Sequence, residues 1–189
     1  MPAEAPDPPR MTPEEFFAFA EEQEGSFEFR NGEVVAMSGG KGRHSDIGSR
    51  LSGMLYQRLR GTPCRHNTSD LFVAIPGREN YLLPDASITC GPRVHEDERE
   101  VAAANPKVIF EVLSASTQDY DRGRKFDLYR RIPSLEEYVV IAQGNPLVIG
   151  HLRESENAWH LAAWTGLDAV ARVRSVPLEL PLAELYAER

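Results

Sequence analysis

The sequence predicts an α/β protein in which a mixed β-sheet is flanked by helices and extended by antiparallel strands near the C-terminus. Three observations lead to this fold class. Residues 108–113 form an apolar run with β-branched and aromatic residues, which is typical of a buried strand. Residues 44–60 carry apolar side chains at helical spacing, which indicates an amphipathic helix. Three apolar runs separated by turn residues follow residue 137 and indicate an antiparallel meander.

The N-terminal part predicts a helix and then a β-hairpin. Thr12-Pro13-Glu14-Glu15 combines a capping hydroxyl, a proline at the first helical position and acids in the first turn, so a helix should begin here. Phe27-Glu28-Phe29-Arg30 alternates as a strand does, and Asn31-Gly32 is a strong signal for a two-residue turn. Residues 1–10 contain four prolines and should form a disordered leader, which leaves residues 11–189 as a single domain.

The remaining elements follow from apolar runs and turn residues. A helix that begins like a capping box at Ser116-Thr117-Gln118-Asp119 should continue to about Arg131, before Pro133. A short terminal helix should begin at Pro181. Strands are expected over residues 64–66, 71–75, 82–89, 108–113, 138–142, 147–152 and 158–164.

Composition and charge restrict the partners. The formal net charge of −8 argues against indiscriminate binding to DNA, which depends on basic surface. Local basic patches can still face phosphates. No apolar run reaches the roughly 20 residues of a membrane span, so no membrane partner is expected. Candidates for a basic patch are Lys41, Arg43, Arg50, Arg122, Arg124, Lys125, Arg130 and Arg131.

The cysteines bear on the compartment. Cys64 and Cys90 are the only two in the chain, and they do not form a CxxC pair. We therefore expect a reduced, cytoplasmic setting, although two cysteines leave room for one disulfide.

Two acidic residues interrupt apolar sequence that is typical of strands. Asp85 follows Leu82-Leu83-Pro84, and Glu111 lies within residues 108–113. A carboxylate on a core strand is unfavourable unless it is paired, hydrogen-bonded or bound to a metal. Two such acids on neighbouring strands could hold one hard divalent cation. This arrangement is typical of metal-assisted hydrolysis, above all of phosphodiesters.

Several blocks of sequence, in their order along the chain, carry a family resemblance. The most specific is Pro106-Lys107-Val108-Ile109-Phe110-Glu111-Val112-Leu113-Ser114-Ala115-Ser116-Thr117, followed by Asp121, Lys125, Tyr129 and Glu137-Tyr138. An earlier block runs from Phe27 to Met37 and continues with His44, and a middle block is Pro84-Asp85. Over roughly Thr12 to Ala142 the chain resembles the Uma-type restriction-endonuclease family, a branch of the PD-(D/E)XK nuclease superfamily.

The resemblance implies a restriction-endonuclease-like fold and an endonuclease that depends on Mg²⁺ (or Mn²⁺). Its substrate would be nucleic acid, with DNA favoured over RNA, and a homodimer would be needed to cut both strands. Asp85 and Glu111 would bind the metal. The superfamily places a lysine two positions after the glutamate, but that position is Leu113 in this chain. The resemblance implies that Lys125, on the following helix, serves instead and stabilises developing negative charge.

Further site residues are carried over in the same way. Glu28 would contribute another acid near the metal. His44, at the start of a helix, would meet a phosphate or a water molecule on the metal. Tyr129 lies one helical turn beyond Lys125 and could orient it.

Each of these residues also has an ordinary structural interpretation. Asp85 could cap a turn after Pro84, and Glu111 could pair with an arginine. Lys125 could form a surface pair with Asp121, four residues earlier. Glu28 could be an exposed hairpin residue, and His44 a simple helix-terminal residue.

Two other functions stay open beside the nuclease. One is a non-catalytic module that binds nucleic acid or assembles with partners on a nuclease scaffold, which the Leu113 departure and the acidic total both favour. The other is a phosphodiesterase of small nucleotides, which would suit an acidic surface.

Overall fold

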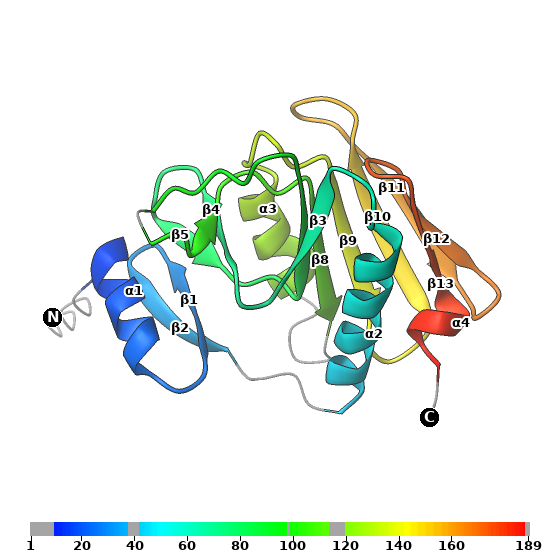
Figure 1. Ribbon diagram of the computed structural model, residues 1–189, viewed down its shortest axis with the longest axis horizontal. Helices are drawn as coiled ribbons and strands as arrows, with labels where there is room; N and C mark the ends of the chain where they lie inside the picture. The colour runs from blue at the N-terminus through cyan, green and yellow to red at the C-terminus, as the bar shows by residue number, and fades with distance from the viewer. Residues whose placement is uncertain (1–9, 38–41, 98, 114–119, 188–189) are drawn as a thin grey trace, which may run out of the picture.

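The computed structural model describes residues 10–37, 42–97, 99–113 and 120–187, and for residues 120–122 it describes the backbone alone. The expected leader, the capping box at residues 116–119 and Lys41 therefore lie outside the described residues. Within them, helices and β-sheets alternate, which confirms the predicted α/β class. Figure 1 shows α1, β1 and β2 at one end of the molecule and β12, β13 and α4 at the other.

The strands form two larger sheets and a separate hairpin. The five-stranded sheet has the order β2-β1-β5-β4-β7, and the six-stranded sheet has the order β11-β10-β9-β8-β6-β3. The first contains β1 Ser26–Arg30, β2 Glu33–Met37, β4 Phe72–Ile75, β5 Asn80–Leu82 and β7 Ala102–Ala103. The second contains β3 Cys64–Thr68, β6 Ala86–Cys90, β8 Val108–Leu113, β9 Glu137–Ala142, β10 Leu147–Arg153 and β11 Trp159–Thr165. The hairpin consists of β12 Val170–Val173 and β13 Leu178–Pro181.

The six-stranded sheet is mixed, as the sequence predicts. β8 and β9 are parallel, because the chain crosses over between them through helical structure. The other pairs are antiparallel, including the predicted meander of β9, β10 and β11. The helices are α1 Pro13–Glu22, α2 Arg43–Arg58, the π-helical segment η1 Tyr120–Lys125, α3 Phe126–Tyr129 and α4 Leu182–Leu185.

The N-terminal helix and hairpin form for the reasons seen in the sequence. The Thr12 hydroxyl accepts a hydrogen bond from the backbone N–H of Glu15, and the Glu15 carboxylate accepts one from the N–H of Thr12. The turn between β1 and β2 uses Asn31 at φ 52° and Gly32 at φ 87°. These left-handed conformations are the ones that favour asparagine and glycine in a two-residue hairpin turn.

The strand predicted over residues 82–89 is broken, and this prediction was wrong. β5 ends at Leu82 and belongs to the five-stranded sheet, whereas β6 begins at Ala86 in the six-stranded sheet. Pro84 has no N–H to donate to a ladder. The N–H of Leu83 is instead bound by the Glu28 carboxylate at 3.1 Å. The break carries the chain from one sheet to the other and leaves Asp85 at the start of β6.

The helix predicted to continue to about Arg131 differs in form. In its described part, a π-helical turn at Tyr120–Lys125 passes into a short α-helix, Phe126–Tyr129, which ends before Pro133 as expected. π-helical turns occur frequently at functional sites. Lys125 lies at the junction between the two helical forms.

The side chains of β8 separate two hydrophobic clusters. Val108, Phe110 and Val112 pack in a cluster with residues of α2 and α4. Ile109 and Leu113 pack on the opposite face, in a cluster that includes Tyr129 of α3. Because side chains alternate along a strand, Glu111 lies on the α3 face together with Ile109 and Leu113. A third cluster lies between α1 and the five-stranded sheet.

The two cysteines lie opposite one another on neighbouring strands. Cys64 of β3 pairs with Cys90 of β6, and a disulfide joins them. The disulfide left open by the sequence is therefore present, and it attaches the edge strand β3 to the sheet. Among the described helices, none combines the length and the apolar character that crossing a bilayer requires.

The C-terminal hairpin was not predicted, and a buried carboxylate holds it against the sheet. Glu137 begins β9 and is 2% exposed. Its Oε2 accepts hydrogen bonds from the N–H of Arg174 at 2.8 Å, and from the N–H and the hydroxyl of Ser175, both at 2.9 Å. Burial raises the pKa of Glu137 above its usual value, although these hydrogen bonds act in the opposite direction.

This pKa predicts how stability changes with pH. The folded-state pKa of Glu137 lies above the unfolded value of 4.5, so the unfolded state loses its proton first as pH rises. The free energy of unfolding of the wild type, relative to the non-titrating Glu137→Gln variant, should therefore fall as pH rises from about 4.5 through the raised pKa. Urea denaturation of both proteins across this range measures the difference. A difference that stays constant or grows with pH would contradict the prediction.

Candidate active site

The site lies where β6 begins and β8 approaches its end. In the antiparallel β6–β8 pair, Ala86 is opposite Phe110, and continuing this register by one position would set Asp85, the bend residue before β6, opposite Glu111. Side chains at directly opposite positions project from the same face of a sheet. Asp85 is fixed there because its Oδ2 accepts a hydrogen bond from the N–H of Val112 at 2.6 Å. Asp85, just before β6, therefore lies beside the neighbouring strand β8, which carries Glu111.

Glu111 is buried and bound by two side chains from the helical segment after β8. Its Oε1 lies 3.0 Å from the ammonium of Lys125 and accepts a hydrogen bond from the Tyr129 hydroxyl at 2.9 Å. Lys125 is 1% exposed and Tyr129 is fully buried. Burial raises the pKa of Tyr129 well above its usual value, and the charges of Glu111 and Glu28 raise it further. Tyr129 therefore stays protonated and donates to Glu111 over the whole neutral range.

Glu28 reaches the same lysine from the other sheet. Its Oε1 lies 3.0 Å from the Lys125 ammonium and also accepts the N–H of Leu83. Its Oε2 accepts hydrogen bonds from the Arg30 guanidinium, with the Nε of Arg30 at 2.9 Å. Glu28 is completely buried. The lysine thus joins a carboxylate of the five-stranded sheet to a carboxylate of the six-stranded sheet.

The solvent side of the site is formed by Asp85 and His44. His44 lies in the first turn of α2, and its Nε2 is 3.5 Å from Oδ1 of Asp85. Both side chains are about one-fifth exposed, at 20% for His44 and 22% for Asp85. The site therefore has a buried, charged interior and one accessible carboxylate at its surface.

The structure brings together every residue that the sequence predicts for the site. Asp85 contacts His44, Glu111 contacts Lys125 and Tyr129, and Lys125 contacts Glu28. The alternative in which Glu28 is an exposed hairpin residue is wrong, because that side chain is fully buried. A surface pair for Lys125 is likewise inconsistent with its burial.

The interpretation of Asp85 as a cap of a local turn does not fit the structure. Asp85 binds a backbone group across the sheet rather than capping a local turn. Leu113, at the usual lysine position, is fully buried on the face that carries Glu111.

Sequence reasoning missed two groups that hold Glu28. One is Arg30, which lies two positions beyond Glu28 on β1, and the other is the backbone N–H of Leu83. The first was detectable, because residues two apart on a strand share a face. The second had no signal in the sequence, since it depends on the break between β5 and β6.

The carboxylates of the site could give a hard cation only one or two protein ligands. Among the described residues, no group of three or more histidine, cysteine, aspartate or glutamate side chains is arranged to hold a metal ion. Asp85 and Glu111 are the pair whose register places them opposite each other. Mg²⁺ is usually bound by one or two carboxylates, with water and substrate phosphates completing its octahedron. The residues present therefore fit Mg²⁺ better than a cation that needs a full protein cage.

Comparisons with known proteins bear on the family and the fold of the chain. Over 178 residues the chain is 32% identical to "Uncharacterized protein slr1290" of Synechocystis sp., an alignment that covers 94% of this chain and 92% of that one. It is 29% identical to "Uncharacterized protein sll1609" of the same organism, over 84% of this chain and 90% of the other.

A solved structure shows a similar fold. It is the crystal structure of "a putative nuclease belonging to DUF820" from Anabaena variabilis, with a TM-score of 0.76 and 17% identity over 94% of this chain and 98% of that one. The model of the Uma2 family, described as "Putative restriction endonuclease", matches residues 13–183, which include the whole candidate site. The chain therefore belongs to the Uma2 family.

Proposed function

We propose that this protein is a nuclease that hydrolyses phosphodiester bonds in nucleic acid with Mg²⁺ or Mn²⁺, and that DNA is its substrate in preference to RNA. The observation that carries the proposal is the convergence of Asp85, Glu111 and Lys125 from separate segments of the chain. The β6–β8 register, continued by one residue to Asp85, supports the pairing of the two acids, and the Lys125 ammonium lies 3.0 Å from Glu111. The family's description supports the same class of reaction.

The charges around the lysine explain how the buried acids are kept in place. Glu28 and Glu111 carry two negative charges, and Lys125 and Arg30 carry two positive charges. Buried charges are tolerated when they are paired and hydrogen-bonded in this way. These contacts fix the Glu111 carboxylate in place, and together with Asp85 it would supply the negative charge that a divalent ion requires.

Asp85 and Glu111 would hold the metal, and when bound the metal would supply Lewis-acid polarisation of the scissile phosphate. Three side chains of the protein would have further roles beside the metal. Lys125 places a positive charge beside Glu111, where it would stabilise the negative charge that develops during phosphoryl transfer. Tyr129 fixes the orientation of Glu111 by its hydrogen bond. His44 lies at the accessible edge of the site, where it would meet a phosphate of a bound strand.

A non-catalytic module that binds nucleic acid is the second candidate. Leu113 at the usual lysine position favours it, as does the pairing of Glu28 with Arg30 and Lys125 and of Glu111 with Lys125. The homodimer and the cytoplasmic location stay predictions. The Cys64–Cys90 disulfide argues against a reducing cytoplasm, because disulfides persist mainly in oxidising compartments.

Metal removal tests the proposed function. The wild-type protein is incubated with labelled single-stranded DNA, duplex DNA and RNA in Mg²⁺, in Mn²⁺ and in EDTA at matched ionic strength. We expect cleavage with either metal and none in EDTA. We also expect a gain of about 1.4 kcal/mol in unfolding free energy at a metal concentration ten times Kd. Cleavage in EDTA would contradict the role of the metal. Binding without cleavage under all conditions would favour the second candidate.

A further inference from the structure

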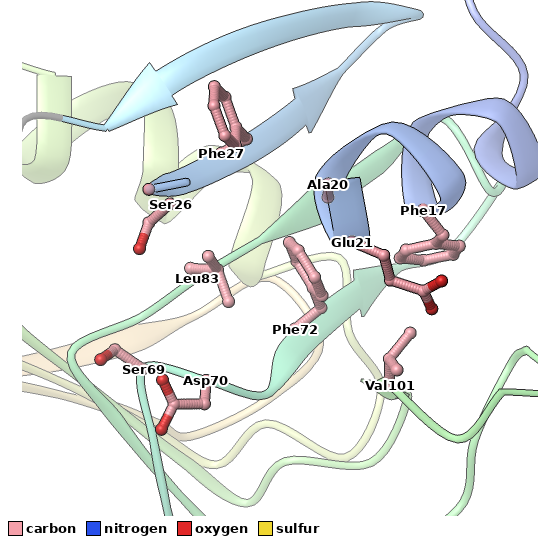
Figure 2. A pocket seen from close by; sticks show the side chains of 11 residues that line it. Phe17, Ala20, Glu21, Ser26, Phe27, Ser69, Asp70, Phe72, Leu83 and Val101 are labelled. Carbon is pink, nitrogen blue, oxygen red and sulfur yellow. The ribbon is translucent and has the colours of Figure 1, made fainter. Parts of the chain in front are cut away.

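A pocket of about 200 Å³ lies beside the candidate active site, between α1, β1 and the loop that follows β3 (Figure 2). Two of its lining residues are neighbours of the site along the backbone. Leu83 donates its N–H to the Glu28 carboxylate that binds Lys125. Ser69 follows Thr68, which pairs with Ala86, the residue next to Asp85. Leu83 and Ser69 therefore place the pocket next to the segments that carry Glu28 and Asp85.

The walls of the pocket are apolar and rigid. Phe72 lies near its centre in Figure 2, close to Leu83. The Phe72 ring is held edge-on by Phe16 and Phe17, with ring centroids 5.5 and 5.6 Å away. The ring belongs to the packed cluster beneath α1, so it is fixed before any ligand arrives. A fixed aromatic wall of this kind is suited to contact with another flat ring.

The rim of the pocket is acidic and hydroxylic. Figure 2 shows Ser26, Ser69 and Asp70 on one side of Phe72 and Glu21 on the other. Arg99 pairs with Glu21 at 2.8 Å. Asp70 is exposed at the rim, and its Oδ2 accepts the Thr68 hydroxyl at 3.0 Å. Among the described residues that line the pocket, none is basic. A phosphate would be repelled here, whereas a ligand that donates hydrogen bonds would be accepted.

The volume selects the size of the ligand. Sites for complete small-molecule ligands usually measure about 300–1,000 Å³, so this pocket fits a single ring system rather than a whole nucleotide. A carboxylate at the rim is a natural acceptor for the exocyclic amino group of cytosine or adenine. A base can enter such a pocket only when it is unpaired, as in single strands or after extrusion from a duplex.

We propose that this pocket binds one unpaired, amino-bearing nucleobase, a cytosine or an adenine, adjacent to the phosphodiester presented to Asp85 and Glu111. The inference rests on the proposed function for its substrate class and deepens it. It makes a single-stranded or locally opened nucleic acid the substrate, which agrees with an acidic chain of net charge −8 that is poorly suited to holding a long duplex.

Binding of defined oligonucleotides tests the proposal without any requirement for cleavage. The probes are fluorescein-labelled oligothymidylates whose central residue is thymine, cytosine or adenine, and anisotropy is measured with Ca²⁺ and with EDTA. The wild type should bind the cytosine and adenine probes about 10-fold more tightly than the all-thymine probe. Equal affinity for all three probes, or no binding of any, would overturn the proposal.

Two variants assign the preference to the pocket. Asp70→Ala removes the acceptor at the rim, and Ser26→Phe fills the pocket from an exposed strand position. Each should reduce the 10-fold preference to about 1-fold. The matched controls Asp168→Ala and Ser155→Phe, at exposed positions in the turns that flank β11, should retain it. A preference that survives both pocket variants would overturn the proposal.

The ratio between probes is the measured quantity because removal of a charge changes the affinity for all probes alike. Cleavage of the same probes in Mg²⁺ separates the two proposals. A base preference in a protein that cleaves nothing supports the pocket and contradicts the nuclease. Cleavage with no base preference contradicts the pocket and supports the nuclease.

Discussion

Replacing Lys125 with methionine should lower the free energy of unfolding by about 3–5 kcal/mol, because breaking a buried ion pair leaves an uncompensated charge in the interior. The ammonium lies 3.0 Å from both Glu28 and Glu111, and all these side chains are almost completely buried. Glu28 would keep Arg30 as a partner, while Glu111 would retain the hydrogen bond from Tyr129. Methionine has a similar length, so the loss measures charge rather than volume. Urea denaturation at neutral pH measures the change.

A matched variant and a second substitution make this experiment specific. Lys107 forms an ion pair with Glu136 at the surface, so Lys107→Met should cost less than about 1 kcal/mol. Adding Glu111→Gln to Lys125→Met removes the stranded charge and should recover more than about 1 kcal/mol of the loss. A cost for Lys125→Met as small as that for Lys107→Met would show that the lysine does not hold the two sheets together.

Substituting Asp85 with asparagine should reduce cleavage by about 10²- to 10³-fold while leaving the fold intact. The amide oxygen of asparagine can still accept the N–H of Val112, so the local structure is kept. The amide is neutral, however, and neutral oxygens are weaker ligands for Mg²⁺ than carboxylates. Single-turnover cleavage in Mg²⁺ measures the rate, and thermal unfolding with and without Mg²⁺ measures the loss of metal binding.

The control for Asp85→Asn is Asp168→Asn, which removes the same charge from an exposed turn between β11 and β12. It should keep both the activity and the stabilisation by Mg²⁺. Cleavage by Asp85→Asn at the wild-type rate would remove Asp85 from the proposed metal site, whatever its position opposite Glu111.

The elements that could be predicted are those whose signals are local. The capping box at Thr12 and Glu15 and the Asn31-Gly32 turn specify their own backbone geometry, and the structure contains both. The strand at residues 108–113 was identified because six buried positions in a row require apolar side chains, and Glu111 was noticeable as the exception. Such features depend on residues that are close together in the sequence.

The features that could not be predicted depend on distant partners. The break at Leu83 and Pro84 is held by residues of two other strands. Glu28 of β1 accepts the N–H of Leu83, and Val112 of β8 donates its N–H to the Asp85 carboxylate. The C-terminal hairpin was missed because Glu137, far upstream, fixes its turn. Lys125 was predicted from the family resemblance alone. Nothing in the sequence of its helix indicated that its ammonium would lie between Glu28 and Glu111.

The connection between β5 and β6 makes length, as well as residue identity, a condition for the site. Only residues 83–85 lie between the two strands. Side chains alternate along β6, so inserting or deleting a single residue there would shift its register by one position. Asp85 would then lose its contacts with Val112 and His44, and the apolar side chains of β6 that pack against α2 would turn to the opposite face. Natural variation in chain length should therefore be found in the outer turns and not in this joint.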